Sequence, residues 1–266
     1  MTIKKLPYNN STLHYSVGGQ GKTVLLLHGF AEDSSIWEDF IPELSNHYNL
    51  IIPDIPGSGK STLLQETQVG LEEYADSIHF ILAKENIDKC CMIGHSMGGY
   101  ITLAFAEKYP GMLEGMGLFH SSAYADDDQK KETRKKAIEF IREKGSNAFL
   151  KTSIPGLFAD DVKNKTAIEQ LIEKGKQFSP EALSQYYQAM INRPDRTTIL
   201  KNALSPVLFI MGEHDKAVLF NHSLEQSYLP SESHIHIFRN SAHMSMLEEK
   251  EKSFNSLAHF LHFVYV

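Results

Sequence analysis

The stretch that most constrains this chain is Gly94-His95-Ser96-Met97-Gly98, a G-x-S-x-G motif near the middle of 266 residues. An apolar run from Cys90 to Ile93 precedes it and predicts a buried strand, and the apolar residues from Tyr100 to Tyr109 predict a helix. Glycines on both sides of the serine suit a sharp turn, because the backbone there leaves little room for side chains. The pattern predicts that Ser96 lies at the tip of a strand-to-helix turn, beside the positive end of the helix.

Composition is that of an ordinary globular protein. The chain is 42% hydrophobic and 22% charged, with a net charge of -7. This acidic balance argues against nucleic-acid binding, which usually needs a basic face. The two cysteines, Cys90 and Cys91, lie in the predicted buried strand, where neither a disulfide nor a metal site fits. We find no secretory signal and no apolar run near the ~18 residues of a membrane span, so we expect a cytoplasmic protein that contacts no membrane.

Apolar strands alternate with amphipathic helices along most of the chain. The strands are predicted at about residues 3–6, 12–17, 24–27, 49–52, 90–93, 112–119, 207–211 and 234–238. Helices are predicted between them at about residues 34–44, 71–83, 100–109, 219–228 and 246–263. Continuous apolar strands separated by helices indicate a mostly parallel sheet covered on both faces. Functional residues on such a sheet gather at the carboxyl ends of its strands.

The middle of the chain departs from this alternation. Between Ala123 and Ser205 no convincing strand occurs, and helices are predicted at about residues 128–143, 147–150, 163–174 and 180–191. Residues 124–202 carry 15 of the 26 Lys and Arg residues but only 12 of the 33 Asp and Glu residues. This shift in composition indicates an insert. We therefore predict a helical cap (lid) at 123–205, inserted into a core domain made of 1–122 and 206–266.

Two further polar residues follow predicted strands, Asp215 and His243. A serine hydroxyl needs a base to take its proton, and that base needs an acceptor to orient it. We predict that Ser96, His243 and Asp215 fill these roles, in the chain order expected of a G-x-S-x-G turn in an α/β sheet. The backbone amides of Phe30 and Met97 are the predicted donors to the oxyanion that forms during acyl transfer.

The remaining candidates concern the substrate pocket and metal binding. The predicted pocket residues are His28, Trp37, His95, His120, Leu157 and Phe158. Among them His28 and His95 favour structural roles, because each lies in a tight loop beside the serine turn, and Trp37 also suits the core. The pairs His234/His236 and His259/His262 have no matching acid or cysteine cluster, so we predict no metal site and no cofactor.

Taken together, these motifs resemble the α/β-hydrolase superfamily, in its branch of capped esterases, lactonases and C–C hydrolases, over nearly the whole chain. The resemblance rests on His28-Gly29-Phe30, the loop from Asp54 to Ser61, Gly94 to Gly99, Gly212 to Asp215, and Ala242-His243-Met244 followed by Glu248. It implies an α/β-hydrolase fold, with an eight-stranded, mostly parallel sheet whose second strand is antiparallel, helices on both faces, and the cap after the sixth strand. These motifs are specific for the fold and say little about the substrate.

We predict a serine hydrolase that cleaves a small-molecule carboxylic ester or small lactone through an acyl-enzyme. A serine nucleophile argues against the epoxide hydrolases and haloalkane dehalogenases of this superfamily, which carry aspartate there. Cleavage of a thioester or a C–C bond, and perhydrolysis, stay open because they use the same triad. A small-molecule sensor that keeps the triad is a further alternative, which an exposed apolar patch on the lid would favour. The oligomeric state, monomer or homodimer, is left open.

Overall fold

Eight strands form one sheet in the computed structural model, which describes residues 1–266. The order across the sheet is β1-β2-β4-β3-β5-β6-β7-β8. The strands are β1 (Thr2–Tyr8), β2 (Ser11–Gly18), β3 (Thr23–Leu27), β4 (Asn49–Asp54), β5 (Cys90–His95), β6 (Leu113–Phe119), β7 (Val207–Gly212) and β8 (Ser233–Phe238). β2 is antiparallel to β1 and β4, and every other neighbouring pair is parallel. The predicted eight-stranded, mostly parallel sheet is confirmed.

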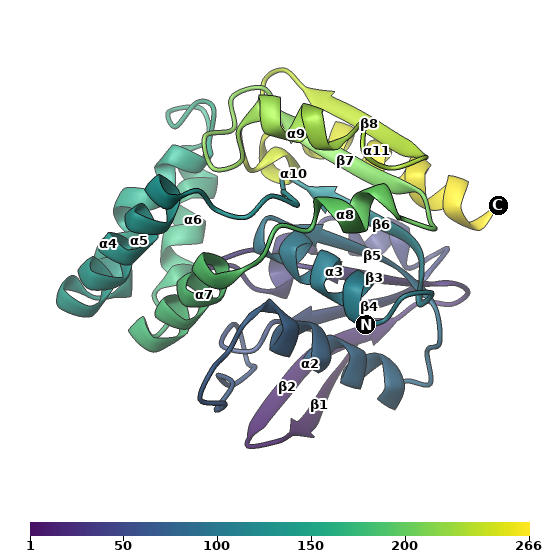
Figure 1. Cartoon of the computed structure of the whole chain (residues 1–266), viewed down its shortest axis with the longest axis horizontal. Helices are drawn as coiled ribbons and strands as arrows, with labels where there is room; N and C mark the ends of the chain where they lie inside the picture. Colours follow the sequence, from purple (N-terminus) through teal and green to yellow (C-terminus); the bar gives the residue numbers. More distant parts are fainter.

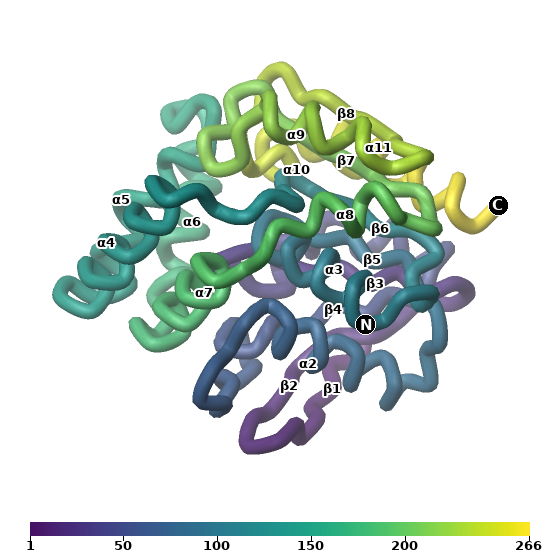
Figure 2. Tube along the Cα trace, in the orientation of Figure 1, coloured from purple at the N-terminus to yellow at the C-terminus, as the bar shows by residue number.

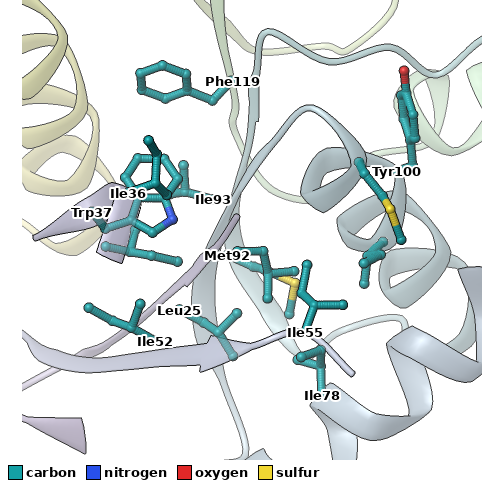
Figure 3. Packing of buried hydrophobic residues seen from close by; sticks show 14 of the residues in the cluster. Leu25, Ile36, Trp37, Ile52, Ile55, Ile78, Met92, Ile93, Tyr100 and Phe119 are labelled. Carbon is teal, nitrogen blue, oxygen red and sulfur yellow. The ribbon is translucent and has the colours of Figure 1, made fainter. Parts of the chain in front are cut away.

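The central strands are apolar because both of their faces are covered. Every residue of β3, β5 and β7 is buried, whereas the edge strand β1 alternates between exposed and half-buried residues. In Figure 1, the helices α2 (Leu71–Lys84), α3 (Met97–Lys108), α8 (Thr197–Lys201) and α9 (Phe220–Gln226) lie in front of the sheet, and α11 (Lys250–Tyr265) lies behind it. Figure 3 shows the core beside β5, where Trp37 packs edge-on against Phe119 with their ring centroids 5.5 Å apart.

Three helical predictions need correction. The helix expected at 34–44 is a 3-10 turn, η1 (Ser34–Trp37), followed by the short α1 (Ile41–Leu44). Pro42 lies in the first turn of α1, where a missing amide is tolerated, but it cannot continue a helix that began earlier. The expected helix at 246–263 is divided into α10 (Ser245–Glu248) and α11 by non-helical backbone at Glu249. α8 was not predicted, because five residues are too short for a periodic pattern.

Helices alone fill the segment between β6 and β7, as predicted. They are α4 (Asp128–Lys144), α5 (Ser146–Ser153), the 3-10 turn η2 (Pro155–Leu157), α6 (Lys165–Gly175), α7 (Pro180–Asn192) and α8. Figure 2 shows the chain leaving the sheet after β6, forming α4 to α7 at one side, and returning through α8 to β7. Apolar residues of these helices, such as Ile141, Leu150 and Leu183, belong to the same buried cluster as the sheet. The division at 123 and 205 into core and cap domains stays a prediction.

No helix of this fold combines the length and the apolar character that crossing a membrane requires.

Candidate active site

Ser96 lies at the tip of the turn between β5 and α3. Its backbone has φ 51° and ψ -115°, a conformation that residues other than glycine rarely adopt. Residues 90–95 and 97–105 are all buried, and Ser96 alone in this stretch is half-exposed. A Cβ at Gly94 would overlap the backbone of Gly98, and one at Gly98 would lie 2.7 Å from the carbonyl oxygen of His28. The two glycines therefore permit the close packing that presents the serine side chain.

Asp215 and His243 meet at the same edge of the sheet. The Nδ1 of His243 donates to Oδ2 of Asp215 over 2.7 Å, and both side chains are at least 95% buried. The other oxygen of Asp215, Oδ1, accepts from the backbone amides of Ala217 and Val218. Burial opposes the charge of Asp215, but the charge and hydrogen bond of His243, aided by His120, hold the pKa of this carboxyl well below its usual range. Asp215 therefore stays ionised, and Nε2 of His243 is the ring nitrogen left to accept a proton.

A second imidazole, that of His120, lies beside this pair. Its Nδ1 is 3.5 Å from Oδ2 of Asp215, and its Nε2 is 2.8 Å from Oγ of Ser245. Burial lowers the pKa of His120 to about 4, so its ring is neutral at pH 7. The ligand atoms of His120, Asp215 and His243 lie within 4.8 Å of one another, a spacing that suits a metal ion. Nδ1 of His243 and Oδ2 of Asp215, which such an ion would need as ligands, are already hydrogen-bonded to each other.

The loop after β3 packs directly against Ser96. A Cβ at Gly29 would lie 3.1 Å from the Cβ of Ser96, so the backbone passes close to the nucleophile candidate. The amides of Phe30 and Met97 donate no hydrogen bond within the chain. Both amides are therefore free to donate, and their role toward an oxyanion stays a prediction.

A buried ion pair between Glu32 and His95 holds the loop after β3 in place. Oε2 of Glu32 accepts from the amide of Gly29 over 2.6 Å and lies 2.9 Å from Nδ1 of His95, whose Nε2 donates to the carbonyl oxygen of His243. Burial works against both charges, but their pairing and hydrogen bonds raise the pKa of His95 and lower that of Glu32. The Glu32–His95 pair thus connects the Phe30 loop to the loop that carries His243.

The structure places the predicted pocket residues in three kinds of surroundings. His28 and His95 are buried, and both ring nitrogens of each are engaged within the protein, His28 with the segment from Ile55 to Ser58. Trp37 is completely buried in the core rather than at a pocket wall. His120 contacts Asp215, and Leu157 accepts a 2.9 Å hydrogen bond from the amide of His243 through its carbonyl oxygen. Phe158 is buried within the main apolar cluster.

Two residues of this region were missed by the sequence analysis. Glu32 follows His28-Gly29-Phe30 by two residues, and an acidic group so close to a glycine turn is the sequence signal that would have identified it. Ser245 follows His243 by two residues, and its contact with His120 depends on tertiary structure. No sequence pattern predicts the contact between Ser245 and His120.

Comparisons with known proteins agree with this architecture. A family model described as the alpha/beta hydrolase fold matches residues 22–116. The chain is 24% identical over 249 residues to a Pantoea ananatis protein named as a carbamate hydrolase, RutD, covering 89% of this chain and 88% of that one. It is 27% identical over 273 residues to 2-hydroxy-6-oxo-6-phenylhexa-2,4-dienoate hydrolase of Comamonas testosteroni, covering 96% and 93%.

A solved structure covers the whole chain. The thermophilic esterase of Thermogutta terrifontis, solved with malate bound, is 26% identical, has a TM-score of 0.93 and aligns over 100% of both chains. The similarity extends through the helices between β6 and β7 as well as the sheet. Together with the sheet order, these matches confirm the fold class expected from the sequence.

Proposed function

We propose that this chain is a serine hydrolase of the α/β-hydrolase superfamily, whose fold it shares, and that it cleaves a carboxylic ester or a small lactone. The observation that carries the proposal is the 2.7 Å bond between Asp215 and His243 at the edge of the sheet where the Ser96 turn also ends. An acid, an imidazole and a strained serine turn at one edge are the groups that acyl transfer needs.

The proposed reaction begins with attack of Ser96 Oγ on the substrate carbonyl carbon. Nε2 of His243 takes the serine proton, and Asp215 stabilises the imidazolium that forms. The amides of Phe30 and Met97 donate to the oxyanion, a contribution of about 3 kcal/mol for one well-placed donor. His243 then protonates the departing alcohol oxygen, which leaves the acyl group on Ser96. A water molecule, deprotonated by His243, releases the acid in the same manner.

The same groups suit a second reaction class. A C–C or carbamate bond can be cleaved with a serine, a histidine and an oxyanion site, and relatives named for hydrolysis of a carbamate and of a dienoate align over most of this chain. An ester is favoured because the T. terrifontis esterase aligns over the full length of both chains. A sensor role has less support, since the exposed large apolar side chains of residues 123–205 are Phe140, Val162 and Leu204, on separate elements.

Hydrolysis of p-nitrophenyl esters with acyl chains of two to twelve carbons tests the proposal. We expect turnover that is greatest for short acyl chains and that falls by at least about 1,000-fold in Ser96→Ala, because the nucleophile is lost. The exposed Ser231→Ala in the loop before β8 is the matched control and should keep full activity. A folded protein that hydrolyses none of these esters would move the assignment to C–C or carbamate cleavage. Activity that survives in Ser96→Ala would contradict the proposed nucleophile.

A further inference from the structure

A cavity of about 720 Å³ lies between α4 and the loops that follow β6 and β7. Two of its lining residues, Ala217 and Val218, donate their amides to Asp215. Two others, Phe149 and Tyr187, pack on the ring of Phe30, with centroids 6.4 Å and 4.3 Å from it. The cavity therefore adjoins both the proposed acid and the proposed oxyanion loop.

One wall of this cavity holds more positive than negative charge. The buried carboxylate of Asp126 lies between two arginines, 2.6 Å from Nε of Arg134 and 2.9 Å from Nη2 of Arg193. The arginine side chains are only 13% and 4% exposed. Two guanidinium groups and one carboxylate leave a net charge of +1, which is costly to bury without a counter-ion. The other charged lining residues, Asp127, Glu225, Lys130 and Lys216, are exposed or half-exposed and balance one another.

Several donors of these arginines have no partner. Arg134 uses only Nε in hydrogen bonding, which leaves both of its terminal amino groups free. Nε of Arg193 is buried without any hydrogen-bond partner, while Nη1 and Nη2 bond the carbonyl oxygens of Met190 and Tyr124. Free terminal amino groups on one guanidinium match the two oxygens of a carboxylate.

Tyr100 connects this wall to the serine turn. It lies in the first turn of α3, and Figure 3 shows its hydroxyl pointing away from the labelled apolar side chains. The guanidinium of Arg193 lies over its ring, 4.1 Å from the centroid. Burial alone would raise the pKa of Tyr100, yet the positive charges of Arg193, Lys130 and Arg134 lower it. This tyrosine therefore experiences the same uncompensated positive charge, four residues after Ser96.

We propose that the cavity binds a carboxylate carried by the substrate, with Arg134 as its main partner, so that the preferred substrates are half-esters of dicarboxylic acids or lactones with a free carboxylate. A single carboxylate neutralises the net charge of +1, whereas a phosphate dianion would leave a surplus negative charge in a partly buried wall. The inference rests on the proposed hydrolase function, since it names the substrate class of that same site.

Two pairs of esters test the inference, and the two members of each pair differ in one carboxylate. They are p-nitrophenyl hemisuccinate with p-nitrophenyl butyrate, and 4-carboxyphenyl acetate with phenyl acetate. We expect the carboxylate to raise kcat/KM by about tenfold or more in at least one pair, and Arg134→Gln to remove that preference by lowering kcat/KM about tenfold more for the charged ester than for the neutral one. Arg134→Lys should keep part of the preference, and the exposed Arg142→Gln on the same helix should keep all of it. Equal rates within both pairs, or equal losses for charged and neutral esters in Arg134→Gln, would overturn the inference.

Binding without turnover separates this inference from the proposed function. Calorimetry with succinate on Ser96→Ala should show binding that is lost in Ser96→Ala/Arg134→Gln, with dimethyl succinate as the neutral control. Arg134-dependent binding of succinate by a protein that hydrolyses no ester would refute the proposed function and keep the carboxylate site. Ser96-dependent ester hydrolysis without such binding would do the opposite. Tighter binding of inorganic phosphate than of succinate would refute the assignment to a carboxylate.

Discussion

His120 brings a second imidazole to the carboxylate of Asp215, and its surroundings fix its tautomer. The amide and the hydroxyl of Ser245 both lie within hydrogen-bond distance of Nε2, so Nε2 is the acceptor and Nδ1 carries the proton. Nδ1 lies 3.5 Å from Oδ2 of Asp215 without the geometry of an ordinary hydrogen bond, so its proton attracts the acid only through a weak electrostatic contact. A neutral donor at this distance stabilises the ionised acid without adding a competing charge. We therefore predict that His120 is a positioning residue that acts through Asp215.

Two substitutions of His120 distinguish the roles of its two ring nitrogens. The side-chain amide of Asn reaches the place of Nδ1, whereas that of Gln reaches the place of Nε2. We expect His120→Gln to lower kcat roughly tenfold with little change in KM, because Asp215 loses a donor. His120→Asn should stay within about threefold of the wild-type kcat, and Asn also tolerates the positive φ of 50° at this position. Steady-state kinetics on one p-nitrophenyl ester would measure both variants. Equal losses in Asn and Gln would show that the donor to Asp215 is not what matters.

For single residues, the sequence predicted which ones lie at the ends of strands better than it predicted which side chains contact each other. Asp215 and His243 were identified because each follows its own apolar strand, and parallel strands end at one edge. The Glu32–His95 pair and the His120–Ser245 contact were not predicted, because each joins residues from segments far apart in the chain. Their partners are set by how loops pack, which hydrophobic periodicity does not report. The catalytic roles of Ser96, Asp215 and His243 stay predictions until the variants are measured.

Among the elements, strands were easier to predict than short helices. β3, β5 and β7 are apolar runs because helices cover both faces, and that pattern is visible in any window of five or six residues. The break between η1 and α1 and the break at Glu249 each lie inside a stretch whose apolar spacing stays helical. Local backbone geometry decides such breaks, so periodicity predicted one helix where two separate elements occur.

Glu248 on α10 holds two segments together at the site. One carboxylate oxygen accepts from the amide of Ala159, just after η2, and the other from the amide of Ala242, next to His243. The backbone bond between His243 and Leu157 lies beside them. The chain after η2 is thereby fixed to the loop that carries the proposed base. Orientation of His243 depends on this link as well as on Asp215.

Loss of this link should loosen both segments. We expect Glu248→Ala to lower the free energy of unfolding by about 1–2 kcal/mol, because two backbone amides lose their acceptors. Hydrogen exchange should rise at residues 157–160 and 242–244, and kcat should fall severalfold. The exposed Glu251→Ala on α11 is the control and should change neither quantity. Unchanged exchange at 157–160 in Glu248→Ala would refute the proposed role of the link.

Across the whole molecule, buried titratable groups set how stability depends on pH. Several carboxyls with pKa values below their usual range, among them Glu32, Asp126 and Asp215, stabilise the fold above about pH 4 and lose that contribution as the pH falls further. His120 affects the stability of the fold in a higher pH range. Its pKa is about 4 in the folded protein and about 6.5 when exposed, so the unfolded chain binds a proton first as the pH falls from 6.5 to 4. His95, whose pKa is raised, contributes the opposite sign, and its stabilisation is lost as the pH rises.

The free energy of unfolding should therefore fall between pH 6.5 and 4, and His120 should account for up to about 3 kcal/mol of that fall. Urea denaturation at half-unit intervals from pH 4 to 8 measures it. In His120→Asn no buried imidazole has to be kept neutral, so the slope between pH 6.5 and 4 should flatten while the carboxyl-dependent loss below about pH 4 remains. The half-buried His236 also has a lowered pKa, but its partial exposure to solvent makes a smaller contribution, which His236→Asn would measure. An unchanged slope in His120→Asn would mean that His120 keeps its exposed pKa within the fold, because the charge of Asp215 offsets the effect of burial, and it would contradict this prediction.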